Sequence, residues 1–174
     1  MNIKSIENFL SEELFNELNN HVSQLNSNKN TIFKSNINRW EPELLDNSTP
    51  VMIYSFDDSD KNLFFKLKKE IENRIPFIIS GINIYQWPKL SYLPWHTDEG
   101  YKSALTVYLN ESWNPNWGGY FMYEMDNEIR AIKPERNLAV LQEGGVPHCV
   151  NTININAPMR LTMQIFLTKT KSLL

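Results

Sequence analysis

Apolar positions recur with a helical period only in the first part of the chain. Between residues 11 and 25 they are spaced four, four and three positions apart, which predicts an amphipathic helix with Ser11 as its N-cap. A second stripe of the same period predicts a helix over residues 59–74, which Pro76 ends. The stripe positions are Leu14, Leu18, Val22 and Leu25, then Phe64, Leu67, Ile71 and Ile75.

After Pro76 the pattern changes to short runs rich in Ile, Val and aromatic residues, separated by turn residues, as β-strands are. No helical stripe interrupts them. They predict an antiparallel sandwich or jelly roll, with a double-stranded β-helix as its core and the helices covering one side. The predicted strands are 77–87, 103–110, 118–124, 128–133, 137–142, 148–153 and 159–168.

The length of 174 residues favours one domain. We expect residues 1–76 to form a helical N-terminal support and residues 77–170 to form the jelly-roll core. The segment 38–50 looks irregular, and it and the loop 111–119 are candidates for a lid over a site.

The composition is that of a globular protein, with 41% hydrophobic and 12% aromatic residues. The net charge of −3 does not indicate a protein that binds nucleic acid. The single cysteine, Cys149, permits no intrachain disulfide. The N-terminus lacks an apolar run of the signal-peptide type, and the most apolar stretch, 75–85, is too short and interrupted to span a bilayer. We therefore expect a soluble, cytoplasmic protein.

The stretch SYLPWHTDEGY places His96 and Asp98 two positions apart, which puts both side chains on one side of an extended segment. An imidazole and a carboxylate are two thirds of the facial triad that holds non-haem Fe(II). His148 can supply the third ligand, since it follows a tight turn and opens a predicted strand. His21, the remaining histidine, is expected at the polar edge of the first helix, on the surface.

Arg160 and Thr162 are also two positions apart, so both face the same side of the last predicted strand. An arginine that points inward among apolar strand residues is costly unless an anion pairs with it. A guanidinium fits a carboxylate with two parallel hydrogen bonds, and a hydroxyl can add a third. This pair therefore indicates a site for an acidic ligand.

In these residues the chain resembles the Fe(II)/2-oxoglutarate-dependent dioxygenases, particularly the prolyl 4-hydroxylase-like branch. The resemblance rests on His96-Thr-Asp98, then His148, then Arg160-Leu-Thr162, in that order. Residues 106–124, TVYLNESWNPNWGGYFMYE, also resemble the strand–loop–strand of the hypoxia-factor prolyl hydroxylase relatives. The resemblance as a whole covers residues 80–168. It implies a jelly-roll enzyme in which His96, Asp98 and His148 bind the iron.

The same resemblance implies the cosubstrate site. Arg160 binds the distal carboxylate of 2-oxoglutarate, and Thr162 assists it. Tyr85 matches a tyrosine that often reaches this cosubstrate in the family. Tyr92 and Thr106 are further candidates near the pocket.

The reaction implied is hydroxylation of a C–H bond, coupled to oxidative decarboxylation of 2-oxoglutarate to succinate and carbon dioxide. Fe(II), 2-oxoglutarate and O2 are the expected cofactors, with ascorbate to keep the iron reduced. Related halogenases carry a small residue in place of the carboxylate, so Asp98 favours hydroxylation.

The substrate is left open between several classes. The leading candidate is a prolyl residue of a protein or peptide; the alternative is a free amino acid, a small metabolite or a sugar. A non-catalytic jelly-roll binding module and a cupin-type isomerase are further alternatives. A nucleic-acid demethylase fits less well, because the chain is acidic and lacks a recognisable second arginine downstream of Arg160.

Each candidate also has a plain structural interpretation. His96 with Asp98 could be a surface pair, His148 a core histidine bonded to a carbonyl, Tyr85 a core residue, and Arg160 the partner of Glu143 or Glu99. The ring of Trp95 should point away from the iron, because it alternates with His96. The aromatic residues that could shape a substrate mouth are Tyr92, Trp95, Trp113 and Trp117.

Overall fold

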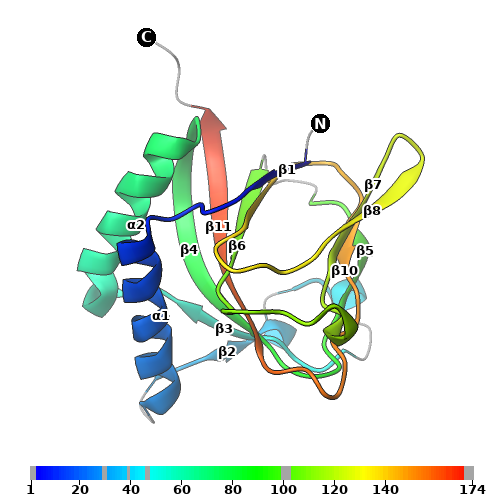
Figure 1. The fold of residues 1–174 in the computed structure, drawn as a ribbon, viewed down its shortest axis with the longest axis horizontal. Helices are drawn as coiled ribbons and strands as arrows, with labels where there is room; N and C mark the ends of the chain where they lie inside the picture. The colour runs from blue at the N-terminus through cyan, green and yellow to red at the C-terminus, as the bar shows by residue number, and fades with distance from the viewer. Residues whose placement is uncertain (1–2, 29–30, 39, 46–47, 99–102, 171–174) are drawn as a thin grey trace.

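Two antiparallel sheets face each other, and two helices pack on the outer side of the larger sheet (Figure 1). The computed structural model describes residues 3–28, 31–38, 40–45, 48–98 and 103–170. The architecture is the mainly β, double-stranded β-helix that the strand pattern predicts.

The larger sheet has seven strands within the described residues, in the order β1-β9-β6-β11-β4-β3-β2. Its centre is the long antiparallel pair of β4 and β11, whose register places Thr162 beside Tyr85. The strands are β1 (Ile3–Ile6), β2 (Lys34–Ser35), β3 (Met52–Ser55), β4 (Phe77–Trp87), β6 (Ser103–Tyr108), β9 (Ala139–Glu143) and β11 (Arg160–Thr170).

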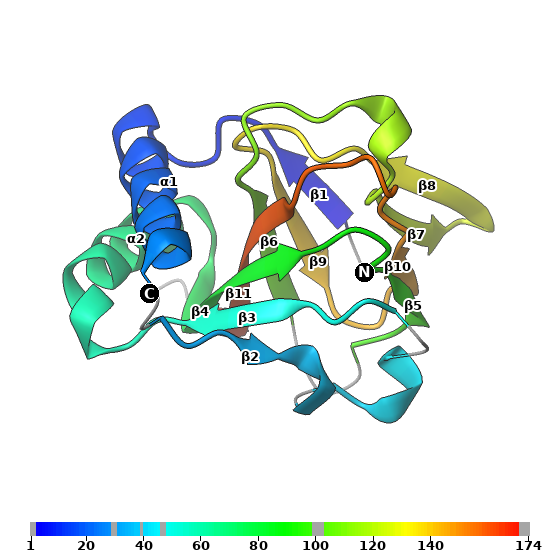
Figure 2. The same ribbon diagram turned by 90° about the horizontal axis from the view of Figure 1, so that it is seen from below.

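The smaller sheet has four strands in the described part of the chain, in the order β5-β10-β7-β8, and it faces the larger sheet across the molecule (Figure 2). Its register brings His148 opposite His96. The strands are β5 (Leu93–His96), β7 (Phe121–Met125), β8 (Glu128–Ile132) and β10 (His148–Val150).

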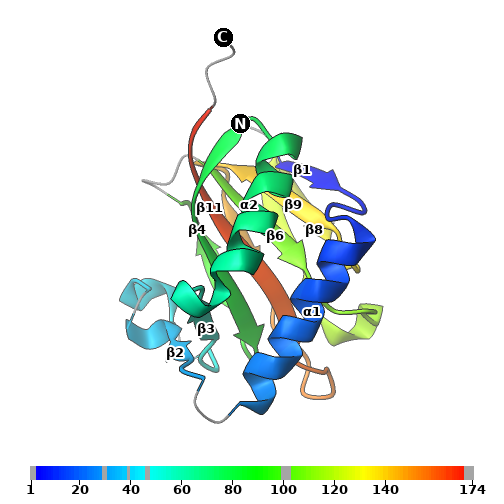
Figure 3. The same cartoon turned by 90° about the vertical axis from the view of Figure 1, so that its left-hand side faces the viewer.

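The two helices lie across the outer face of the larger sheet (Figure 3). They are α1 (Glu12–Ser27) and α2 (Lys61–Arg74), close to the predicted bounds. Their apolar stripes and the outer face of the sheet form the main core, in which Leu18, Leu67 and Ile165 are fully buried. Short 3-10 helices cover Asn36–Asn38, Pro42–Leu44, Asp58–Asp60 and Pro115–Trp117.

Two local details differ from the sequence prediction. Ser11 stands at the N-cap of α1, but its hydroxyl donates to Glu70 on α2 instead of capping its own helix. His21 is not a free surface residue, since its Nε2 lies 3.0 Å from the buried carboxylate of Asp60. Both contacts join neighbouring elements, which a helix-by-helix analysis of the sequence does not reveal.

Residues 1–76 provide more than helices, because β1, β2 and β3 complete the two edges of the larger sheet. These strands have four residues or fewer. A run this short shows no clear alternation, which is why the sequence pattern missed them. Among the described helices, none has the length and apolar character needed to cross a bilayer.

Candidate metal centre and cosubstrate pocket

A cavity of about 450 Å³ lies between the two sheets. Both sheets and the segment after β2 contribute to its wall. The lining residues are Trp40, Glu41, Leu44, Asn83, Tyr85, Trp87, Leu93, His96, Asp98, Thr106, Phe121, Gln142, His148, Val150, Arg160, Thr162, Gln164 and Phe166.

Two histidines and an aspartate meet at the smaller sheet. His96 ends β5, His148 begins β10, and the two are register partners with ring centroids 4.1 Å apart. Asp98 follows β5 by two residues; one carboxylate oxygen lies 3.5 Å from Nε2 of His96 and the other 3.8 Å from Nε2 of His148. One possible ligand atom from each residue lies within 4.8 Å of the others. This is the two-histidine, one-carboxylate donor set that suits non-haem Fe(II).

Both imidazoles are oriented in the same way. Nδ1 of His96 lies 2.8 Å from the carbonyl oxygen of Pro94, and Nδ1 of His148 lies 2.8 Å from that of Val146. A carbonyl can only accept, so each Nδ1 carries the proton and each Nε2 keeps its lone pair. Metal-binding histidines are commonly oriented by a second hydrogen bond of this kind. The plain interpretation of His148 as a carbonyl-bonded histidine is therefore correct and is also compatible with metal binding.

The protonation states suit a cation. Burial disfavours the charge on Asp98, but its contacts with His96 and His148 outweigh this effect, and the pKa of Asp98 is lowered. Burial and the neighbouring His96 lower the pKa of His148. At neutral pH these two residues therefore present an anionic carboxylate and a neutral imidazole, the forms that bind a metal.

Arg160 begins β11, lines the same cavity and is 1% exposed. Its guanidinium carbon lies 5.0 Å from the centroid of the Trp87 ring and 5.1 Å from that of the Tyr108 ring. Nε and Nη1 are buried and have no hydrogen-bond partner among the described residues. Burial lowers the pKa of Arg160, opposed in part by Tyr108, yet an arginine stays charged in proteins.

Buried guanidinium donors without a partner are costly, and a bound carboxylate removes that cost. A carboxylate from the chain itself does not satisfy these two atoms, since Nε and Nη1 have no partner among the described residues. Glu99, one of the two structural alternatives, lies outside the described residues. The residues present therefore fit a dicarboxylic keto acid with one end at the triad and the other at Arg160.

The three other predicted cosubstrate residues in this region lie on the cavity wall. Thr162 is 1% exposed and its hydroxyl accepts a hydrogen bond from Nε1 of Trp87 at 3.1 Å. Tyr85 is the register partner of Thr162 on β4. Thr106, on β6, donates to the side chain of Gln164 at 2.6 Å.

Other predicted aromatic residues do not line the cavity. Tyr92 is absent from the described wall, because its backbone is tied to Ser48 and the next residue, Leu93, turns inward instead. Trp113 and Trp117 contact each other and pack on a small apolar cluster. The loop 111–119 thus contributes nothing to the described wall, whereas 38–50 contributes three residues, Trp40, Glu41 and Leu44.

Sequence analysis missed three residues beside the site: Trp87, Tyr108 and Gln142. Tyr108 is 1% exposed and its hydroxyl, like the Arg160 nitrogens, is buried without a described partner. The sequence could have indicated Tyr108, since it lies two positions after Thr106 on one predicted strand and therefore faces the same side. Gln142 follows Leu138 and Val140 at the same spacing of two, but a single glutamine at the end of a predicted strand does not by itself indicate a site.

Comparison with known proteins agrees with this geometry. The family model described as "2OG-Fe(II) oxygenase superfamily" matches residues 81–168, half of the chain. No curated protein sequence matches the chain.

Solved structures share the fold at low identity. A prolyl-4-hydroxylase from Pseudomonas putida superposes with a TM-score of 0.70 and 18% identity, covering 95% of this chain and 92% of that one. A prolyl hydroxylase from Trichoplax adhaerens, in complex with a hypoxia inducible factor peptide fragment, gives 0.67 and 18%, covering 95% and 82%. The non-haem, alpha-ketoglutarate-dependent epimerase SnoN from nogalamycin biosynthesis gives 0.68 and 9%, covering 96% and 77%.

The chain therefore belongs to the 2OG-Fe(II) oxygenase superfamily and is a 2-oxoglutarate-dependent dioxygenase that uses Fe(II) and O2.

Proposed function

We propose that His96, Asp98 and His148 hold the catalytic Fe(II). The supporting observation is the matched orientation of the two imidazoles: each Nδ1 is held by a carbonyl, and each Nε2 is directed to the Asp98 carboxylate. When bound, the iron supplies the activation of O2 that amino-acid side chains cannot perform. These three side chains would supply three ligands, and the cosubstrate and O2 would take other positions on the metal.

We propose that Arg160 grips the distal carboxylate of 2-oxoglutarate. The free Nε and Nη1 donors support this, and so does the free hydroxyl of Tyr108 beside them. Thr162 stands beside Arg160 on the same strand face, while Trp87 and Tyr85 wall the site. Thr106 lies further along the cavity wall, beside Gln164. In the buried cavity, these charge-assisted hydrogen bonds are stronger than they would be in water.

The proposed substrate is a prolyl residue of a protein or peptide, hydroxylated at a C–H bond. Support comes from the fold shared with the two prolyl hydroxylases, one of which was solved with a peptide.

A second candidate keeps the reaction and changes the substrate to a polar small molecule, such as a free amino acid or a sugar. The cavity wall beyond Thr162 carries Asn83, Thr106 and Gln164, which can hydrogen-bond such a substrate. Incubation with proline-containing peptides and with free amino acids, followed by mass spectrometry for a gain of one oxygen atom, separates the candidates.

One assay tests the function itself. The protein is supplied with Fe(II), ascorbate, O2 and 2-oxoglutarate, and succinate is measured with and without substrate. His96→Ala is expected to lose metal affinity, and Arg160→Ala to keep the metal but bind 2-oxoglutarate at least 10-fold more weakly, since charged hydrogen bonds contribute about 1.5–3 kcal/mol each. Normal 2-oxoglutarate affinity in Arg160→Ala would refute that residue's role.

A further inference from the structure

Gln142 is a buried amide on the inner face of β9. It is 6% exposed and lines the cavity. The residues that precede it on the same face, Leu138 and Val140, pack in an apolar cluster with Tyr108 and Phe121. The inner face of this strand is therefore apolar until it reaches the metal ligands, and there it carries an amide.

The amide nitrogen of Gln142 lies between two of the three triad residues. It is 3.3 Å from one carboxylate oxygen of Asp98, Oδ2, and 2.9 Å from Nδ1 of His148. Nδ1 of His148 already donates to the carbonyl of Val146, so it has no lone pair to offer. The amide nitrogen is also 3.2 Å from Nε2 of His148. Because it lies at similar distances from both ring nitrogens, it sits over the face of the imidazole, away from the in-plane lone pair of Nε2. Oδ2 of Asp98 is consequently the acceptor for the amide.

The two oxygens of Asp98 have different surroundings. Oδ1 lies 3.5 Å from Nε2 of His96, and Oδ2 faces both the Gln142 amide and, at 3.8 Å, Nε2 of His148. A carboxylate with one oxygen held by a hydrogen bond is fixed in rotation, because turning it breaks that bond.

We propose that Gln142 is a positioning residue that holds Oδ2 of Asp98 away from the metal, so that Oδ1 alone coordinates it. This inference rests on the proposed metal site. Monodentate binding leaves one more coordination position open than bidentate binding does, and 2-oxoglutarate and O2 both require open positions. Without the amide, the carboxylate is free to turn and occupy a position that the cosubstrate needs.

A merely structural role for Gln142 predicts something different. If the amide served only the packing and hydrogen bonding of the interior, its replacement would change stability, and the metal would be bound as before. A partner of a metal ligand affects metal binding instead, typically by about 10–100-fold. The two roles are separated by measuring the metal directly, independently of turnover.

The test titrates Co(II), whose visible absorption reports coordination number and geometry, into the wild-type chain, Gln142→Leu and Gln142→Asn. Leucine keeps the size and removes the amide, and asparagine keeps the amide but withdraws it by one methylene. Gln164→Leu is the matched control, since it removes a second cavity glutamine whose oxygen accepts from Thr106.

We expect both Gln142 variants to bind Co(II) about 10–100-fold more weakly, with an altered absorption spectrum, and Gln164→Leu to match the wild type. The 2-oxoglutarate affinity of the Co(II)-loaded Gln142 variants should also fall. If Gln142→Leu does not fold, Gln142→Asn decides the question by the same measurements. Folded Gln142 variants with wild-type affinity and spectrum overturn this inference alone; a wild-type chain that binds no Co(II) overturns the proposed metal site with it.

Discussion

Tyr108 and Tyr54 are both buried, but their hydroxyl groups are in opposite situations. The hydroxyl of Tyr54 donates to Asp60 at 2.6 Å, whereas that of Tyr108 has no described partner beside Arg160. A buried hydroxyl without a partner costs about 1–3 kcal/mol, which a folded protein tolerates where a ligand later supplies the bond.

Tyr108→Phe is therefore expected to stabilise the ligand-free protein by about 1 kcal/mol, because it removes an unpaired polar atom. It should also weaken 2-oxoglutarate binding about 10-fold, because one hydrogen bond to the carboxylate is lost. Chemical denaturation and 2-oxoglutarate titration of the metal-loaded protein measure the two effects. Tyr54→Phe is the matched control and should destabilise by about 1–3 kcal/mol. A destabilised Tyr108→Phe with unchanged 2-oxoglutarate affinity would mean that the hydroxyl is structural.

Because Gly119 has no side chain, the side chain of Arg160 can pack directly against the backbone at position 119. Its φ is +67°, and a Cβ at this position would come within 2.9 Å of Cδ of Arg160 and 3.1 Å of Ile153. Gly119→Ala is expected to cost about 1–3 kcal/mol through backbone strain and to displace the guanidinium. The 2-oxoglutarate affinity should fall while metal affinity is retained.

Gly81, on β4, is the control for this substitution, since a Cβ there meets nothing within 4 Å. Gly81→Ala should leave stability within about 0.5 kcal/mol of the wild type. Calorimetric unfolding and isothermal titration provide both quantities, and equal behaviour of the two alanine variants contradicts the argument.

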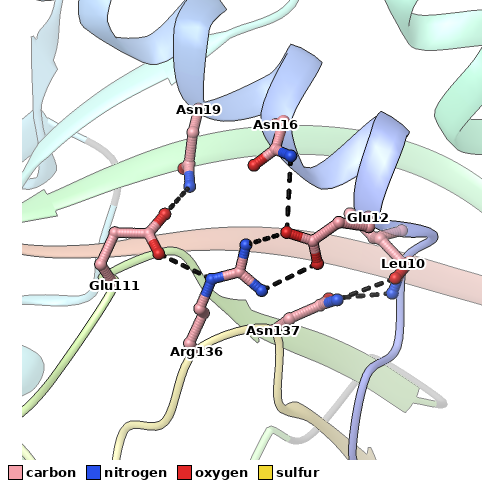
Figure 4. A network of polar contacts seen from close by, with 7 residues as sticks. All are labelled: Leu10, Glu12, Asn16, Asn19, Glu111, Arg136 and Asn137. Atoms are coloured by element: carbon pink, nitrogen blue, oxygen red, sulfur yellow. Dashed lines mark hydrogen bonds and ion pairs between the residues drawn. The ribbon is translucent and has the colours of Figure 1, made fainter.

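At the scale of secondary-structure elements, Arg136 joins α1 to two loops, its own loop before β9 and the loop after β6 that contains Glu111 (Figure 4). The guanidinium donates to Glu12 on α1 and to Glu111, and it lies 4.4 Å from the ring centroid of Phe15. Asn137 adds a pair of hydrogen bonds to the backbone of Leu10. A network of this kind contributes more to stability than a single exposed ion pair, which contributes little.

This network predicts a pH dependence of stability. Hydrogen bonding from Arg136 lowers the pKa of Glu12, against a smaller opposing effect of desolvation. A lowered carboxylate pKa contributes stability that is present above the unfolded-state pKa, about 4.3, and is lost as the pH falls through the folded-state pKa. The stability difference between wild type and Glu12→Gln should therefore be constant near neutrality and shrink below about pH 4.

Urea unfolding of the two proteins across this pH range measures the difference. Glu13→Gln removes an equal charge from the same helical turn and is the matched control for the loss of a charge at the helix N-terminus. A gap that persists unchanged into acid would show that Glu12 does not act through its charge.

At the scale of the whole molecule, the proposed metal ligands and the main core are separate. His96, Asp98 and His148 belong to the smaller sheet and its connection, whereas the main core lies between the helices and the outer face of the larger sheet. None of these three residues is a member of that core. Folding should therefore not depend on the metal.

Removal of metal by a chelator is expected to leave the far-UV circular dichroism and the cooperativity of unfolding intact. Stability should fall only by the binding contribution, about 2.7 kcal/mol at a metal concentration 100 times Kd. Circular dichroism and thermal unfolding with and without EDTA measure this, and loss of secondary structure on chelation contradicts it. His148→Ala, which cannot complete the triad, should unfold at the same temperature with and without EDTA.

Much of the fold was predictable because the signals are local. The helical stripes and the long strands β4 and β11 depend on residue spacing, and the structure confirms them within a few residues. The strands β1, β2 and β3 were not predicted, because two to four residues that pair with distant segments leave no local pattern. The candidate site was predictable where two residues share a strand face, as do Arg160 and Thr162.

The sequence by itself determined the mainly β fold, the donor types of the triad and the presence of an inward arginine, since each follows from residue type and from spacing within one segment. Only the tertiary structure decided what lies around them. It placed Tyr108 and Trp87 against Arg160, brought Gln142 to the carboxylate of Asp98, and left Tyr92, Trp113 and Trp117 off the cavity wall. The physical reason is that contacts between strands depend on register and sheet order, and these are set by pairing and packing across the whole chain.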